Sequence, residues 1–252
     1  MKNVKLIVPN ALTLLNLLTG CVAIIIAFKG KNEYNAAWLI LLAAVFDFLD
    51  GLAARALDAK SEFGKQLDSL ADVVSFGVAP SIILFNWLHL VLIESSSDST
   101  FELISANFPQ VLILMSSLLF VLAGAIRLAR FNILQTESNF FRGLPIPAAA
   151  LIIAAIWLVL GSTENKVVKD LILNIYFVFG VIIIMVFLMV SNIRMLSLKF
   201  RGLSFTKNIL HYILLLVSLL LILQFKVSGI LFSFIFYILL SLITLPFTKT
   251  DT

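Results

Sequence analysis

Four aspartates, Asp47, Asp50, Asp68 and Asp72, lie in two neighbouring apolar stretches of the sequence. A carboxylate is costly to bury without a partner, so a group of four is expected to face a polar interior or a wet cavity. The spacing within each pair, i to i+3 and i to i+4, places both of its members on one face of a helix. A polar turn between the two stretches predicts an antiparallel helical hairpin, in which the four acids meet at one site.

The chemistry that fits this group is the binding of hard divalent cations. Clustered carboxylates repel one another unless positive charge joins them, and oxygen ligands without nearby His or Cys favour Mg²⁺ or Mn²⁺. Two such ions would hold a diphosphate and stabilise its attacking and leaving oxygens. Gly51 and Gly64 leave room for a phosphate or nucleotide against the backbone, and Arg55 offers a guanidinium fork to phosphate oxygens.

The spacing of the acids also allows two other interpretations. One is a cation site in a secondary transporter, and the other is a set of structural ion pairs. Arg55 alone carries too little positive charge to neutralise four acids, which argues against the ion pairs. The transporter stays open at this point.

The chain as a whole is too apolar for a soluble domain of its length. Of its 252 residues 61% are hydrophobic, and the mean hydropathy is +1.10, whereas soluble domains are nearer half apolar. Basic residues punctuate the apolar runs instead of forming a stripe on a polar chain, which excludes a nucleic-acid-binding protein. The bilayer is therefore the expected solvent, and in a membrane helix each aspartate costs about 2.5–3.5 kcal/mol.

Apolar runs of about 20 residues predict transmembrane helices. We expect an all-α polytopic bundle of about eight spans, with a six-helix catalytic core and two further C-terminal helices. A cytoplasmic N-terminus puts most of the lysines and arginines on the cytoplasmic side, and the even span number then returns the C-terminus there. The aspartates lie in the cytoplasmic third of the membrane in this arrangement. The expected spans are roughly 9–28, 34–55, 66–93, 109–130, 145–161, 169–190, 208–225 and 229–247.

The string D-x2-D-G-x2-A-R-x8-G-x3-D-x3-D, from Asp47 to Asp72, resembles the defining motif of the CDP-alcohol phosphatidyltransferase family. Every fixed position is present, including Ala54. The resemblance implies that Asp47, Asp50 and Asp68 bind metal ions. It also implies that Asp72 is both a metal ligand and the catalytic base that deprotonates the acceptor alcohol.

The family resemblance extends to contacts with a CDP-linked lipid. Asn10 and Thr13 follow Pro9 in the first span as a similar family element does, and Ser61 matches a position that often contacts the diphosphate. Simpler interpretations are a helix start for Asn10 and Thr13 and a solvated loop for Ser61. The remaining residues expected to bind the CDP-lipid are Gly51, Ala54, Arg55 and Gly64.

Segments after the motif bear on the acceptor alcohol. The stretches 72–80, 127–132 and 141–147 resemble the membrane-type phosphatidylserine synthases of bacteria and archaea, over roughly residues 5–150. Serine is a zwitterion, so its site needs a cation for the carboxylate and acceptors for the amine. The residues expected to bind it are Arg127, Arg130 and Asn132. The two arginines would equally suit glycerol 3-phosphate, which makes a phosphatidylglycerophosphate synthase the nearest alternative. A simpler interpretation is that they stop translocation of the span and bind lipid phosphates.

The resemblance thus implies transfer of a phosphatidyl group from CDP-diacylglycerol to the hydroxyl of L-serine, with release of CMP. The expected cofactor is Mg²⁺ or Mn²⁺ in a two-metal site, and the expected partners are these two substrates, membrane lipids and a second copy of the chain. We expect a multi-pass protein of the cytoplasmic membrane with its active site facing the cytoplasm. Residues 1–252 would form a single domain, with a catalytic core at about 5–190 and an accessory hairpin at about 208–247.

Overall fold

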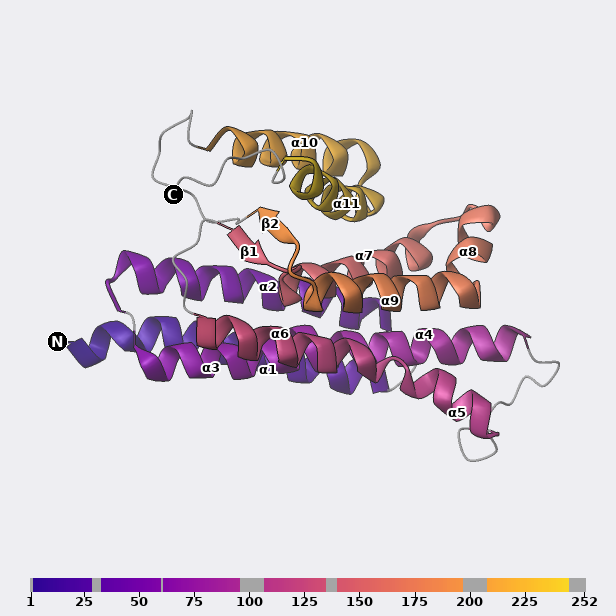
Figure 1. Ribbon diagram of the computed structural model, residues 1–252, viewed down its shortest axis with the longest axis horizontal. Helices are drawn as coiled ribbons and strands as arrows, with labels where there is room; N and C mark the ends of the chain where they lie inside the picture. The colour runs from indigo at the N-terminus through magenta and orange to yellow at the C-terminus, as the bar shows by residue number, and fades with distance from the viewer. Residues whose placement is uncertain are drawn as a thin grey trace.

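A computed structural model describes residues 2–28, 33–59, 61–95, 107–134, 140–196 and 208–244. Nearly all of the described elements are helices (Figure 1). In chain order the elements are α1 (Lys2–Phe28), α2 (Glu33–Ala56), α3 (Glu62–Asp72), the π-helix η1 (Val73–Val78), α4 (Ala79–Ser95), α5 (Phe108–Met115), α6 (Leu118–Leu134), β1 (Phe140–Arg142), α7 (Ile146–Ser162), α8 (Lys166–Ile172), α9 (Ile175–Val190), β2 (Arg194–Leu196), α10 (Ile209–Phe225) and α11 (Val227–Thr244).

The helices form layers (Figure 1). Helices α1, α3, α4 and α6 lie in one layer, α2, α7 and α9 lie over it, and the hairpin α10–α11 contacts α7 from the far side. Helix α7 is the central element: its alanine- and isoleucine-rich sequence is buried along most of its length. Small alanine side chains let neighbouring helices approach closely, which is how helices pack where lipid gives no hydrophobic driving force.

Tryptophan side chains connect α4 to the middle of this core. The ring of Trp87 packs edge-on against Trp157 of α7, with 6.1 Å between ring centroids. Its indole Nε1 donates a hydrogen bond of 3.0 Å to the carbonyl of Ile172 at the end of α8. One buried side chain thus satisfies its polar atom and fixes three helices relative to one another.

Four helical segments among the described residues are long and apolar enough to cross a membrane: Lys5–Phe28, Tyr34–Ala56, Glu62–Glu94 and Phe108–Ile133. Helices α8 and α9 meet at an angle of 59° and make a fifth span if they are counted together. The prediction of a polytopic helical membrane protein is confirmed. The other three expected spans fall on shorter apolar helices, Ile146–Ser162, Ile209–Phe225 and Val227–Ile243, and residues 245–247 of the last expected span lie outside the described residues.

The structure departs from the sequence prediction at two places. The span expected at 169–190 is broken, because the Asn174 side chain accepts a hydrogen bond from the Tyr176 amide and starts a new helix there. The expected all-α fold also contains a small antiparallel pair, in which Phe141 of β1 lies opposite Met195 of β2. The pair satisfies backbone groups of two connecting segments that would otherwise lack partners.

Helix α1 approaches η1 closely where the chain leaves Asp72. A Cβ atom built on Gly20 would lie 2.7 Å from Cα of Ser75, so only glycine fits there. The Ser75 hydroxyl donates a 3.0 Å hydrogen bond to the backbone carbonyl of Asn16. Gly20 therefore allows the contact that positions α1 beside the helix carrying Asp72.

Replacement of this glycine tests the importance of the close contact. We expect Gly20→Ala to destabilise the protein by about 1–3 kcal/mol, because the added methyl group meets the backbone of η1. Gly180→Ala in α9 is the matched control, since a Cβ there meets nothing within 4 Å. The measurement is thermal unfolding of both variants in detergent. An unchanged midpoint for Gly20→Ala would contradict the close packing of α1 on η1.

Candidate metal and substrate site

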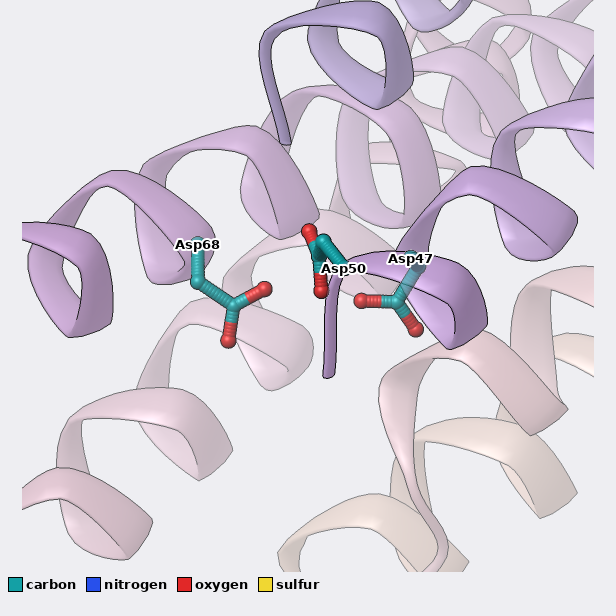
Figure 2. Close-up of side chains that lie close together, drawn as sticks. All are labelled: Asp47, Asp50 and Asp68. Carbon is teal, nitrogen blue, oxygen red and sulfur yellow. The ribbon is translucent and has the colours of Figure 1, made fainter. Parts of the chain in front are cut away.

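Three of the four aspartates come together as their spacing predicts. Asp47, Asp50 and Asp68 each offer a carboxylate oxygen, and these oxygens lie within 4.8 Å of one another. Figure 2 shows the three side chains converging from two helices, α2 and α3. Asp50 is buried and the other two are half-buried. The cluster is therefore partly accessible from outside the helix bundle.

The turn between α2 and α3 brings the two acidic faces together. Its residue Asp58 has a positive φ of 49°, and the Ala59 amide bonds back to the carbonyl of Ala54 over 2.9 Å. Ser61 then caps α3, with its hydroxyl accepting a 3.0 Å hydrogen bond from the Gly64 amide. In the structure Ser61 thus has a local role in starting the helix that carries Asp68 and Asp72.

Helix α1 contributes a hydroxyl group to the acidic cluster. The Thr13 hydroxyl donates to Oδ2 of Asp50 over 2.7 Å, with the Pro9 carbonyl at 3.1 Å as a second acceptor. Asn10 lies one turn earlier, and its Oδ1 would be 3.1 Å from a Cβ atom on Gly64. Both residues predicted in the first span therefore lie at the α2–α3 hairpin, and Thr13 fixes one carboxylate directly.

The two motif glycines have different surroundings. The space beside Gly64 is filled by oxygen atoms of Asn10 and Ser61, whereas a Cβ on Gly51 would meet nothing within 4 Å. Arg55 is exposed, and its Nε donates a 2.9 Å hydrogen bond to the carbonyl of Gly51. Ala54 is half-buried on the same helix. The open backbone at Gly51, with Arg55 one turn further on, leaves space for an anionic group next to the cluster.

Asp72 lies one turn further along α3 than Asp68 and is buried, with 8% of its surface exposed. It is in electrostatic contact with the other three aspartates and with Arg127. Its Oδ1 is buried and has no hydrogen-bond partner among the described residues. A buried carboxylate oxygen without a donor, beside three further carboxylates, fits a site for hard divalent cations.

The three residues predicted to bind the acceptor have different surroundings. Arg127 is buried, interacts electrostatically with Asp72 and stacks over Phe131, with 5.8 Å between its guanidinium carbon and the ring centre. Arg130 donates a 3.0 Å hydrogen bond to the carbonyl of Val190 at the end of α9. The Asn132 amide donates to the Ser69 hydroxyl over 2.8 Å. Arg127 thus lies at the site, while Arg130 and Asn132 contact neighbouring helices.

Asn16 was not among the residues predicted from the sequence. It is fully buried in α1, three residues after Thr13, and its backbone carbonyl accepts the Ser75 hydroxyl. The signal that points to it is a polar amide within an apolar span, on the helix face that also carries Thr13.

A model of the family described as CDP-alcohol phosphatidyltransferase matches residues 6–190. The chain belongs to this family. The match includes every predicted site residue, from Asn10 to Asn132, and ends at the last residue of α9.

Several curated members of the CDP-alcohol phosphatidyltransferase family are similar to the chain. A Methanocaldococcus jannaschii protein named CDP-diacylglycerol–serine O-phosphatidyltransferase is 41% identical over 146 residues, which are 58% of each chain. A Helicobacter pylori protein with the same name is 36% identical over 200 residues, 76% of this chain and 72% of its own. A Methanothermobacter thermautotrophicus protein named archaetidylserine synthase is 39% identical over 154 residues, 60% of this chain and 57% of its own. The chain thus spans between about three-fifths and three-quarters of these relatives.

The contact between Thr13 and Asp50 predicts an effect on metal binding. We expect Thr13→Val to weaken binding of Mn²⁺ about 10–100-fold, the usual effect of losing a hydrogen bond that orients a metal ligand. Thr19→Val is the matched control, because the Thr19 hydroxyl bonds only to the backbone carbonyl of Leu15 among the contacts described. The measurement is titration of purified protein with Mn²⁺ by electron paramagnetic resonance. Equal affinities in the two variants would argue against an orienting role for Thr13.

Proposed function

We propose that the protein is a CDP-diacylglycerol–serine O-phosphatidyltransferase, which makes phosphatidylserine and releases CMP in phospholipid biosynthesis. The family membership and the names of the similar proteins support this reaction. The observation that carries it in the structure is the convergence of Asp47, Asp50 and Asp68 with the buried Asp72 alongside. Such a site suits a diphosphate that is cleaved next to a base.

The four aspartates hold the metal ions in this proposal. The donor set consists of carboxylate oxygens, which favours Mg²⁺ or Mn²⁺ over softer metals. When bound, a pair of such ions offsets the negative charge of the diphosphate and of the leaving CMP. Thr13 holds the carboxylate of Asp50 in place through its 2.7 Å hydrogen bond.

Asp72 is the general base. Its unpaired Oδ1 accepts the proton of the serine hydroxyl as the serine oxygen attacks the lipid-side phosphorus. A new P–O bond forms to serine, the P–O bond to the bridging oxygen breaks, and CMP leaves with the electron pair. Burial of Asp72 keeps competing water away from the attacked phosphorus.

The CDP-lipid lies along α1 and the α2–α3 hairpin in this proposal. Gly51 leaves the backbone open to the diphosphate, and the exposed Arg55 pairs with its oxygens. The remaining proposed contacts of the CDP moiety are Asn10, Thr13, Ala54, Ser61 and Gly64.

Arg127 binds the carboxylate of serine, and Arg130 and Asn132 on the same helix are proposed to border the acceptor site. Two observations favour serine over glycerol 3-phosphate. Arg127 is in electrostatic contact with Asp72, whereas Arg130 is occupied by the carbonyl of Val190. A single arginine next to the base matches the single negative charge of a carboxylate better than a phosphate dianion.

The membrane arrangement is part of the proposal. The three shorter apolar helices complete eight spans, since a helix of 17 residues is about 25 Å long and nearly matches the hydrocarbon core. Both termini and the active site then face the cytoplasm, in accordance with the distribution of basic residues. Residues 1–252 form one domain with an accessory hairpin at about 208–247, and two copies of the chain form a homodimer.

The role of Asp72 predicts a separation of binding from turnover. Asp72→Asn is expected to lower CMP release at least about 100-fold, because the amide cannot accept the serine proton. Binding of CDP-diacylglycerol is expected to persist, because Asp47, Asp50 and Asp68 remain. The control is Asp170→Asn, at an exposed position of α8. Full activity of Asp72→Asn would refute the base assignment.

The proposed reaction is tested with purified protein in detergent. CMP release from CDP-diacylglycerol with Mg²⁺ or Mn²⁺ is expected to require L-serine and to stop when a chelator is added. Release only with glycerol 3-phosphate or inositol phosphate would keep the reaction class and change the acceptor. No release with any acceptor, together with uptake of a solute into liposomes, would favour a cation-coupled transporter instead.

A further inference from the structure

A polar side chain in α1 is buried without a partner. Asn16 has none of its surface exposed. Both polar atoms of its side chain, Oδ1 and Nδ2, lack a hydrogen-bond partner among the described residues. A primary amide in apolar surroundings is costly unless its donors and acceptor are satisfied. This residue therefore lowers the stability of the protein unless something binds to it.

The contact of α1 with α2 fixes the position of Asn16 along the helix pair, relative to the aspartates of α2. The two helices are consecutive and pack along their length, and Thr13 lies opposite Asp50 through a 2.7 Å hydrogen bond. One turn further along α1 is Asn16, and one turn back along α2 is Asp47. Because the two helices run in opposite directions, Asn16 and Asp47 lie at the same height along the helix pair, one turn away from the Thr13–Asp50 hydrogen bond.

The contacts of α1 with α3 and η1 locate Asn16 independently, relative to the aspartates of α3. Asn10 approaches Gly64 and Gly20 approaches Ser75, so α1 runs parallel to the α3–η1 segment. Asn16 lies between these two contacts, which puts it opposite the turn that ends at Asp72. Asn16 therefore lies on α1 at the height of Asp47 on α2 and of the last turn of α3, which ends at Asp72.

We infer that the Asn16 amide binds the acceptor alcohol beside Asp72 and contributes to the choice of a small zwitterionic acceptor. This inference rests on the proposed function. A general base must lie within hydrogen-bond reach of the hydroxyl that it deprotonates, so a polar group next to Asp72 lies next to the acceptor.

The chemistry of an amide fits a zwitterion. The NH₂ group donates to a carboxylate, and Oδ1 accepts from an ammonium or hydroxyl group. A phosphate ester can also accept from the NH₂ group, but it has no ammonium group to donate to Oδ1. A site that hydrogen-bonds both polar ends of an acceptor discriminates strongly against molecules that lack one of them.

Removal of this amide is expected to weaken the binding of serine without destabilising the protein. Asn16→Leu, of similar volume, is expected to raise the KM for L-serine at least about tenfold. The KM for CDP-diacylglycerol and the Mn²⁺ affinity are expected to stay unchanged. The thermal unfolding midpoint without substrates is expected to stay the same or rise, because an unpaired polar group is replaced by an apolar one.

Ser81→Ala is the matched control. The Ser81 hydroxyl in α4 is equally buried and without a partner among the described residues, but it lies about 13 Å further along the helix than Asp72. Its removal is expected to leave the KM for L-serine unchanged. Asn16→Ala removes the amide without adding bulk, and the same rise in KM is expected if the leucine variant does not fold.

The outcomes separate this inference from the proposed function. Wild-type protein that releases no CMP with L-serine would overturn the proposed reaction itself. Normal wild-type activity with an unchanged serine KM in both Asn16 variants would overturn only the role of Asn16. A lower unfolding midpoint with weaker CDP-lipid binding would make Asn16 a structural residue, and a loss of Mn²⁺ affinity would make it a metal ligand; either result refutes acceptor binding.

Discussion

Repulsion among the clustered carboxylates is the constraint on which the rest of the structure depends. Charges interact more strongly where water is excluded, and the oxygens of Asp47, Asp50 and Asp68 lie within 4.8 Å of one another. Asp72 adds a fourth acid, with Arg127 as the cation that faces it. Helices α1, α2 and α3 must hold these groups together against their repulsion. A hydrogen bond from Thr13 and close packing at Gly20 are two of the means.

The local part of the site follows from the sequence because helical periodicity is local. The spacing of Asp47 and Asp50, and of Asp68 and Asp72, needs only the helical repeat and a turn to bring the acids together. The hydrogen bond from Thr13 to Asp50 and the burial of Asn16 depend on how α1 packs against two other helices. No spacing within α1 determines that packing, although the polar side chains in an apolar span indicate where to look.

The predicted acceptor residues show where periodicity stops being informative. Arg127 and Arg130 are three residues apart on one helix, which rotates one from the other by about 60°. With that rotation Arg127 interacts electrostatically with Asp72, whereas Arg130 donates a hydrogen bond to Val190 at the end of α9. Hydropathy likewise missed the bend between α8 and α9, because a single capping asparagine, Asn174, changes the direction of the chain without changing its apolar character.

The cation that faces Asp72 comes from a helix that is made later than the acids. Synthesis proceeds from the N-terminus, so all four aspartates leave the ribosome before Arg127 exists. The second and third membrane segments therefore enter the bilayer carrying acids before Arg127 has been translated. The acids gain this cation only when α6 packs against η1, so completion of the acidic cluster depends on assembly of the later helices with the earlier ones.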